Sequence, residues 1–216
     1  TMVEKLVREK GYPESVLKLT FSYDRAIRGL VIDKMRGNIL KLSRHAAIRV
    51  SYHGLTPIDF RNQTRLYKST YIDLSDSNYN SVDTAFSLAF ASLFMQLVDL
   101  KDRDESAKMP DYAHLAEDLS AVLDQAHSDG SLKDRVRKNL DQFIIKDPDV
   151  VAGLERYKRH GKKLFIVTNS DFNYSKLLLD YTINPFVKEH KSWEDLFDIV
   201  ITLAAKPRLF VGDQRF

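Results

Sequence analysis

The sequence predicts an α/β protein, because two continuous apolar stretches near the C-terminus alternate with helical segments. These stretches are KLFIVT at residues 163–168 and FDIVITLA at residues 197–204. Strands of this kind, without polar alternation, are typical of a parallel sheet that is covered on both faces. Upstream, residues 29–53 alternate in the manner of a β meander, and most of the middle of the chain has helical periodicity.

Composition narrows the class of protein. Of the 216 residues, 44% are hydrophobic and 29% are charged, which is typical of a globular chain. The net charge of +3 is too small an excess to indicate a nucleic-acid partner. Cysteine is absent, which excludes disulfides and thiolate sites and fits a reducing cytosol. No apolar run reaches the ~18 residues that span a bilayer, so no membrane partner is expected.

The first part of the chain predicts a helix and then a meander. The helix MVEKLVREK closes at Gly11 and Pro13. The stretches GLVID, ILKL and AIRVSYH predict strands joined by the turns MRGN and SRHA. Residues 56–80 are polar and irregular, with YKSTYIDL at 67–74 as a short strand.

Helices dominate the region that follows. Residues 81–100 are apolar almost all round, with Ser81 or Asp83 as N-cap, and predict a helix buried on most sides. The next helix, at 113–128, ends at Gly130, and Ser131 caps a further helix over 131–144. Two more helices follow, over 148–160 with Asp147 as its cap and over 174–183.

Polar residues gather where the two apolar strands end. Thr168, Asn169 and Ser170 follow the first strand, and Lys206 and Arg208 follow the second. Ligands of open parallel sheets bind beyond the carboxyl ends of the strands. A hydroxyl, backbone N–H groups and a lysine at one edge suit a phosphoryl group. In the alternative interpretation, Asn169 and Asp171 only start the next helix and Lys206 is a solvated loop residue.

Longer stretches carry a family resemblance. A strand ending in TNS, then a strand and Lys-Pro some 35 to 40 residues later, resembles the second and third motifs of the haloacid-dehalogenase-like (HAD) phosphatase superfamily. TNSDFNYSKLLLDY, TLAAKPRLF, RGLVIDKMRGNILKL, YHG and HSDGSLKDRVRKNLDQF are similar to the cytosolic purine (IMP/GMP-preferring) 5′-nucleotidase family.

The resemblance implies a fold, an HAD-like Rossmann-type parallel sheet core with an inserted, largely helical cap and a small β meander. Residues 1–60 would then be the entry helix and meander, 61–142 the cap, and 143–216 part of the core. The core would be partial, because the first core strand of that fold is missing from this sequence.

The resemblance also implies a reaction. Such enzymes hydrolyse purine nucleoside 5′-monophosphates with an aspartate nucleophile in a D-x-D-x-T motif, an aspartyl-phosphate and Mg²⁺. Thr168 matches the hydroxyl that bonds the phosphoryl oxygens, and Asn169 and Ser170 match its neighbours in the substrate site. Lys206 matches the lysine that pairs with the nucleophile and the phosphoryl group.

The sequence departs from the family in its catalytic motif, because D-x-D-x-T does not occur in it. Asp147 and Asp149 in IIKDPDVV are rejected as the motif, because Asp147 serves better as a helix cap. Asp213 in VGDQRF is rejected as a metal ligand, because it follows Lys206 too closely. The nucleophile and the Mg²⁺ ligands are therefore expected before Thr1 and after Phe216.

The resemblance also points to a nucleoside site. Asp124 and His127 lie three residues apart on one helix face, and Lys133 follows the Gly-Ser cap. Asp124 would accept from a purine N–H, with His127 and Lys133 near the base or the phosphate, and Tyr79 would stack on the base. In the alternative interpretation, these are a surface Asp–His pair and a solvated lysine. Ser120 stands where the family often has an arginine.

The family is cytoplasmic and commonly tetrameric, so a cytoplasmic homo-oligomer is expected. Two alternatives stay open. One is an HAD phosphatase or phosphotransferase that acts on another phosphoester. The other is a nucleotide-binding module without catalysis that lacks the nucleophile.

Overall fold

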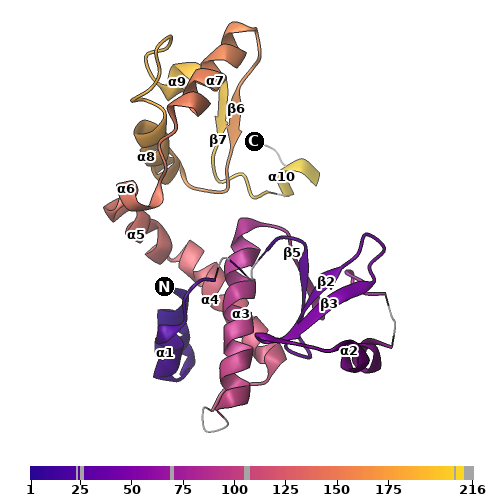
Figure 1. The fold of residues 1–216 in the computed structure, drawn as a ribbon. Helices are drawn as coiled ribbons and strands as arrows, with labels where there is room; N and C mark the ends of the chain where they lie inside the picture. The colour runs from indigo at the N-terminus through magenta and orange to yellow at the C-terminus, as the bar shows by residue number, and fades with distance from the viewer. Residues whose placement is uncertain (23, 25–26, 69–70, 105–107, 207, 212–216) are drawn as a thin grey trace. The chain divides into compact units, whose positions relative to one another are not determined.

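The chain forms two compact units in the computed structural model, Thr1–Ser131 and Leu132–Phe216 (Figure 1). The structure describes residues 1–22, 24, 27–68, 71–104, 108–206 and 208–211. None of the helices described there is long and apolar enough to cross a membrane. The division that the resemblance implies, into an entry segment (1–60), a cap (61–142) and a core (143–216), stays a prediction.

The first unit contains a five-stranded antiparallel sheet with the strand order β4-β3-β2-β1-β5. The strands are β1 (Leu30–Asp33), β2 (Asn38–Leu42), β3 (Ile48–His53), β4 (Thr56–Pro57) and β5 (Tyr79–Val82). The three central strands confirm the predicted meander. The edge strand β5 was not predicted, because only Val82 of its four residues is buried and its sequence is otherwise polar.

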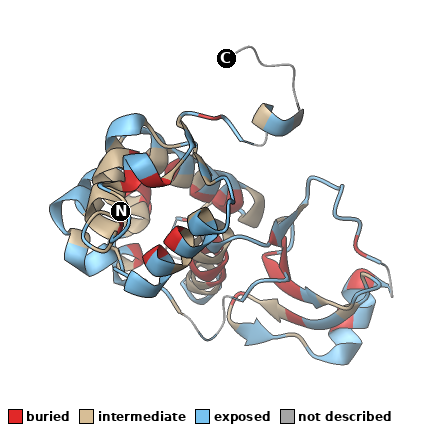
Figure 2. Cartoon of the chain, turned by 90° about the horizontal axis from the view of Figure 1, so that it is seen from above, coloured by how far each residue is buried: buried red, intermediate tan, exposed pale blue. Residues whose placement is uncertain are grey.

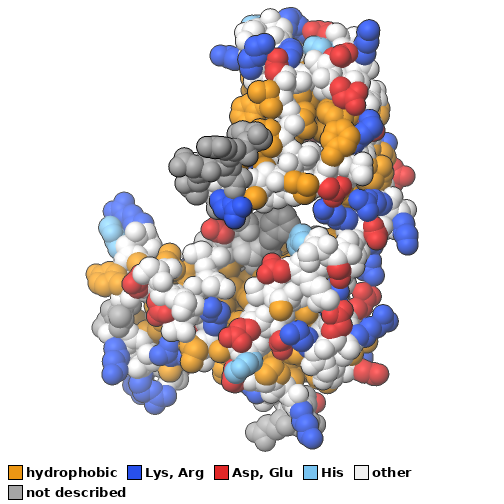
Figure 3. All heavy atoms as spheres, turned by 180° about the vertical axis from the view of Figure 1, so that it is seen from behind, with side chains coloured by type: hydrophobic (Ala, Val, Ile, Leu, Met, Phe, Trp, Pro, Cys, Tyr) orange, Lys and Arg blue, Asp and Glu red, His pale blue; other side chains and the backbone are white. Residues whose placement is uncertain are grey.

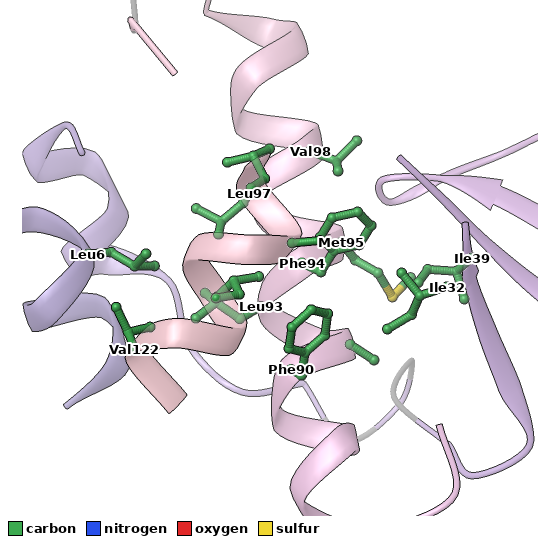
Figure 4. Packing of buried hydrophobic residues seen from close by; sticks show 14 of the residues in the cluster. Leu6, Ile32, Ile39, Phe90, Leu93, Phe94, Met95, Leu97, Val98 and Val122 are labelled. Atoms are coloured by element: carbon green, nitrogen blue, oxygen red, sulfur yellow. The ribbon is translucent and has the colours of Figure 1, made fainter. Parts of the chain in front are cut away.

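The long helix α3 lies at the centre of this unit, between the sheet and the helices α1 and α4. The helices of the unit are α1 (Met2–Lys10), the short 3₁₀ helix η1 (Glu14–Lys18), α2 (Phe60–Tyr67), α3 (Ala85–Arg103) and α4 (Tyr112–Ser128). Phe94 and Leu97 of α3 are fully buried. Figure 4 shows α3 side chains between Leu6 and Val122 on one side and Ile39 of the sheet on the other. Each large apolar side chain buried in this way contributes about 1.5–3 kcal/mol.

The start of α3 differs from the prediction. Thr84, and neither Ser81 nor Asp83, is its N-cap: the Ser87 N–H donates to Thr84 Oγ1 at 3.2 Å, and the Thr84 N–H donates to Ser87 Oγ at 3.0 Å. This reciprocal pair is a capping box. Ser81 belongs to β5 and pairs with Val31, so the chain stays extended beyond the predicted start.

Helix α2 docks on the sheet through polar groups. The Tyr67 hydroxyl donates to the Asp33 carboxylate at 2.8 Å, and Asn38 Nδ2 donates to the Tyr67 oxygen at 2.8 Å. The Asp33 side chain is fully buried and pairs with the Arg36 guanidinium. Burial raises the pKa of Tyr67 above its ordinary value, so the phenol stays a donor.

This polar docking explains a wrong prediction in the region 56–80. Gln63 and Tyr67 are the buried residues of α2, so no apolar stripe marks the helix in the sequence. Residues 71–74 are not a strand, Tyr67 belongs to α2, and residues 69–70 lie outside the described part of the chain.

The second unit contains a parallel pair of short strands and several helices. Its elements are α5 (Ser131–Lys138, which begins at the last residue of the first unit), α6 (Leu140–Phe143), α7 (Pro148–Arg159), β6 (Phe165–Val167), α8 (Phe172–Thr182), α9 (Trp193–Leu196), β7 (Ile199–Ile201) and α10 (Arg208–Val211). The parallel pairing of β6 and β7 confirms the predicted direction of the two strands. A larger Rossmann-type sheet stays a prediction.

One face of the β6–β7 pair packs on a small core, whereas the other is open. The core contains the buried residues Val151, Trp193 and Leu196, and Val200 packs against it. On the other face, Phe165 and Ile199 are 66% and 58% exposed. Figure 2 colours buried residues red and exposed residues pale blue, so the exposed turns of both units can be followed there.

At two helix boundaries in this unit, a side chain bonds to the backbone. The predicted helix over 131–144 is divided into α5 and α6 at Asn139, whose side-chain amide donates to Arg135 O at 3.3 Å. Asp147 caps α7 as predicted, since its Oδ1 accepts from Asp149 N at 2.9 Å and Val150 N at 3.3 Å.

Asp198 holds the beginnings of β6 and β7 together. Its carboxylate accepts from Leu164 N at 2.9 Å, and its own N–H donates to Leu164 O at 2.8 Å. The ammonium groups of Lys158 and Lys163 lie 2.8 and 3.1 Å from the same carboxylate. The Lys158 ammonium and then the Leu164 N–H lower the pKa of Asp198 well below its ordinary value.

The pH dependence of Asp198→Asn tests this arrangement. Because the folded state ionises Asp198 at lower pH than the unfolded chain does, the carboxylate stabilises the fold above the unfolded pKa, about 3.9. That stabilisation is lost as the pH falls towards the folded pKa. We expect Asp198→Asn to lower the melting temperature of the full-length protein near neutral pH, with a difference that shrinks below about pH 4.

The control for this experiment is Asp149→Asn, since the exposed Asp149 carboxylate accepts no hydrogen bond from the described residues. Equal pH profiles for the two variants would contradict the role of Asp198.

Candidate functional site at the ends of β6 and β7

The parallel register brings the two strand ends to one edge. Val167 pairs with Ile201, and the backbone bonds continue beyond the strands. Thr168 N donates to Ile201 O at 2.9 Å, and Ala204 N donates to Thr168 O at 2.9 Å. Residues 168–170 therefore run beside residues 201–204. The polar residues that follow the two strands thus lie at one edge, as we expected from the sequence.

Asn169 connects this turn to Lys206. Its side-chain Oδ1 accepts from Lys206 N at 2.7 Å, and its Nδ2 donates to Lys206 O at 3.2 Å. An amide that faces both backbone groups of one residue fixes the position of that residue. The structure therefore uses the Asn169 side chain to place Lys206, a role that the sequence did not indicate.

The Thr168 hydroxyl is oriented by the turn. Its Oγ1 accepts from Ser170 N at 3.1 Å, which leaves the hydroxyl hydrogen for an oxygen of a ligand. Leu203 N donates to Ser170 O at 2.9 Å, so Ser170 is also held against the second loop. Thr168 and Ser170 are both half-buried.

Lys206 folds back over the end of β6. Its Nζ donates to Val167 O at 2.6 Å, and the side chain is exposed, so the other two ammonium hydrogens are available to a ligand. The loop that carries it contains Leu203 and Ala205 at φ of 51° and 52°. A left-handed conformation costs such residues roughly 1–2 kcal/mol each, and strain of this kind is typical of functional loops.

Asp171 and Lys133 form a pair next to this edge. Asp171 caps α8, since its carboxylate accepts from Tyr174 N at 2.8 Å. The same carboxylate accepts from Lys133 Nζ at 3.0 Å, and Lys133 Nζ lies 5.2 Å from the centre of the Tyr174 ring. The Tyr174 N–H and then the Lys133 ammonium lower the pKa of Asp171. The Lys133 ammonium is thus bound to Asp171, which directly follows Ser170 in the sequence.

The edge suits a phosphoryl group better than a metal ion. The groups at this edge are the Thr168 hydroxyl, the Asn169 amide and the Lys206 ammonium, and the neighbouring carboxylate of Asp171 is already used by Lys133 and the α8 cap. Mg²⁺ takes carboxylate oxygens as protein ligands. Among the described residues, no three His, Asp or Glu side chains gather in a metal-binding group. The residues present therefore do not fit Mg²⁺, and no step is assigned to it.

Of the predicted nucleoside residues, Tyr79, Asp124 and His127 belong to the first unit, whereas Lys133 belongs to the second. Tyr79 lines a cavity of about 430 Å³ together with Ile32, Asn80, Ser81, Asp83, Thr84, Ser87, Phe90, Ser120 and Leu123. On α4, Asp124 follows Ser120 by four residues and His127 follows Leu123 by four residues. Residues with this spacing share one helix face, so Asp124 and His127 lie on the helix face that lines the cavity. The His127 ring bonds Leu123 O through Nδ1 at 2.7 Å. Asp213 lies outside the described residues.

Comparison with known proteins gives the family. A model of the 5′-nucleotidase family matches residues 1–216. The chain belongs to the 5′-nucleotidase family. It is 29% identical over 210 residues to a 5′-nucleotidase domain-containing protein of Dictyostelium discoideum, and this match covers 95% of the chain. It is 27% and 26% identical to 5′-nucleotidase domain-containing protein 2 of Homo sapiens and Rattus norvegicus, in each case over 97% of the chain.

The matches cover only part of these 5′-nucleotidase family members. The chain spans 35% of the length of the Dictyostelium relative, 41% of the human and 38% of the rat protein. Within the chain, the residues at the ends of β6 and β7 come together in one unit. Tyr79, Asp124 and His127 belong to the other unit.

Three features of the site were not predicted: the Asn169–Lys206 bonds, the Asp171–Lys133 pair and the bond from Lys206 to Val167. The cap spacing between Asp171 and Tyr174 is visible in the sequence, since an Asp three residues before a helical N–H is a common N-cap. All three features, however, join residues more than 35 positions apart, and no local pattern marks them.

Asn169→Asp tests how Lys206 is held. A carboxylate still accepts from Lys206 N but repels Lys206 O, so we expect faster hydrogen exchange at the Lys206 amide in the full-length protein, by roughly tenfold. The control is Asn173→Asp, because Asn173 is exposed and bonds nothing among the described residues through its side chain. Unchanged exchange at Lys206 in Asn169→Asp would contradict the role of this amide.

Proposed function

We propose that the protein containing this chain hydrolyses purine nucleoside 5′-monophosphates, with a preference for IMP or GMP. The observation that supports it best is the convergence of Thr168, Ser170 and Lys206 at one sheet edge, in a chain that belongs to the 5′-nucleotidase family. The names of the relatives support nucleotidase activity in general, and the purine preference rests on the sequence resemblance.

In this proposal, the edge binds the phosphoryl group. The Thr168 hydroxyl donates to one phosphoryl oxygen, and the Lys206 ammonium stabilises the negative charge that develops on the others. The Asn169 amide holds the Lys206 backbone, so that the ammonium is placed before the substrate binds. A preorganised donor of this kind lowers the barrier because it does not have to reorient during the reaction.

The remaining chemistry rests on the family resemblance. An aspartate nucleophile would attack phosphorus, the nucleoside would leave with a proton on its oxygen, and water would then hydrolyse the aspartyl-phosphate. The resemblance also implies Mg²⁺, which would supply positive charge near the phosphoryl oxygens. Neither group is assigned to a described residue. A cytoplasmic location and a homo-oligomer are likewise inferred from the resemblance.

Taken by itself, the first unit offers a candidate surface for a nucleoside, the cavity of about 430 Å³ beside Tyr79. Cavities of this size suit small ligands. Tyr79 offers an aromatic face for a purine, and Ser120 and Asp83 offer polar groups at its edges. Asp124, His127 and Lys133 remain the candidates for contacts with the base or the phosphate.

Site variants and a substrate panel test the proposal. In the full-length protein we expect Thr168→Val and Lys206→Met to lower kcat for IMP by roughly 10²-fold or more, because each removes a group aimed at the phosphoryl oxygens. The control is Lys162→Met, an exposed lysine before β6. Steady-state hydrolysis of IMP, GMP, AMP, UMP and a sugar phosphate is the measurement.

The outcomes separate the alternatives. Unchanged IMP hydrolysis in both variants would contradict the roles of Thr168 and Lys206. Faster hydrolysis of another phosphoester would favour a different phosphatase or phosphotransferase. Nucleotide binding without turnover of any substrate would favour a binding module without catalysis.

A further inference from the structure

Positive charge is concentrated in one stretch of the first unit. Residues 41–72 contain six Lys or Arg residues and one Asp, a net charge of +5 in a chain whose net charge is +3. The rest of the chain is therefore net −2. The small net charge of the chain thus conceals a strongly basic segment.

The fold gathers this segment at one end of the unit. Gln63 of α2 accepts from Ser51 Oγ at 2.8 Å and reaches Ile48 O at 3.4 Å, so α2 packs against the β2–β3 hairpin. Ile72 N donates to Ala46 O at 3.2 Å, which places residues 71–72 beside the hairpin turn. Figure 1 shows α2 and this hairpin on the opposite side of α3 from α1, and Figure 3 shows Lys and Arg side chains on the same part of the unit, seen from behind.

Four arginines of this end form what we call the arginine patch: Arg44, Arg49, Arg61 and Arg65. All four are exposed, and none of them forms an ion pair with a carboxylate in the described part of the chain. Arg61 and Arg65 are four residues apart, so they share the outer face of α2. Arg44 donates to the neighbouring His45 ring at 3.1 Å and meets no carboxylate of a described residue.

Exposed aromatic side chains accompany the arginine patch. Phe60, the first residue of α2, is 80% exposed, and Tyr71, beside the hairpin turn, is 69% exposed. Burial of these rings against a partner would be favourable, since a large aromatic ring carries much apolar area. Unpaired arginines together with aromatic rings are the composition that is enriched in protein–protein interfaces.

We propose that the arginine patch, with Phe60 and Tyr71, binds an acidic segment of a protein partner. Arginine guanidinium groups form bidentate bonds to carboxylates, and they lose less on desolvation than ammonium groups do. A partner segment in which Asp or Glu alternates with apolar residues would pair with the guanidinium groups and cover the two rings.

Two other partners fit the arginine patch less well. Nucleic acid is an extended polyanion that is held through many phosphate contacts along its length, whereas the arginine patch offers four arginines at one end of the unit. A membrane surface favours a long amphipathic helix with one apolar face, whereas α2 has eight residues and buries Gln63 and Tyr67 in the protein.

Binding of a short acidic peptide tests the proposal. The probe is a short fluorescein-labelled peptide in which Glu alternates with Leu and Tyr, and the same peptide with Gln in place of Glu is the reference. We expect the full-length protein to bind the acidic peptide, with an affinity that falls as salt is added. Arg61→Glu/Arg65→Glu should weaken binding by at least about tenfold in fluorescence anisotropy.

Matched variants exclude an effect of charge or folding. Arg8→Glu/Lys18→Glu makes the same change of charge on exposed residues of α1 and η1 and should leave the affinity within about twofold. Arg61→Gln/Arg65→Gln should give an intermediate loss. Phe60→Ser, which removes a ring without a change of charge, should also weaken binding.

Several results would overturn the proposal. Equal weakening by the two charge-reversal pairs would show a nonspecific charge effect, and equal binding of the Gln peptide would show that the acidic groups do not matter. Absence of peptide binding would overturn it too. If short poly-uridine RNA or phosphatidylserine vesicles bind in a patch-dependent manner and the peptide does not, the partner is of another class. None of these outcomes depends on nucleotidase activity.

Discussion

The candidate site depends on one interaction, the parallel pairing of β6 with β7 and its continuation beyond the strands. Parallel pairing places both carboxyl ends at the same edge, and the bonds from Thr168 N to Ile201 O and from Ala204 N to Thr168 O carry the pairing into the loops. Asp198 holds the other end of the pair. The bonds that place Lys206, from Asn169 and to Val167 O, join two loops that this register brings together, so loss of the register would separate Thr168 from Lys206.

Much of the α/β pattern could be predicted, because it depends on local signals. The continuous apolar strands and the cap of α7 at Asp147 are visible in short stretches of sequence. The polar edge was also predicted, because strand direction follows from the order of strands and helices. The antiparallel meander followed from its alternation and its Gly-containing turn.

The parts that could not be predicted depend on contacts between distant residues. Helix α2 docks through Tyr67, Asp33 and Gln63, so its buried face is polar and no apolar period reveals it. The amide of Asn169 is used to hold Lys206, although a ligand role was predicted from the motif. The arginine patch could not be recognised from the net charge of the chain, because acidic residues elsewhere offset part of its positive charge.

The central claim is that Thr168 and Lys206 bind one phosphoryl group. The most direct measurement is a crystal structure of the full-length protein with bound orthophosphate. We expect phosphate oxygens within hydrogen-bond distance of Thr168 Oγ1 and Lys206 Nζ, with the Asn169–Lys206 bonds kept. Phosphate bound at a place that contacts neither side chain would contradict it.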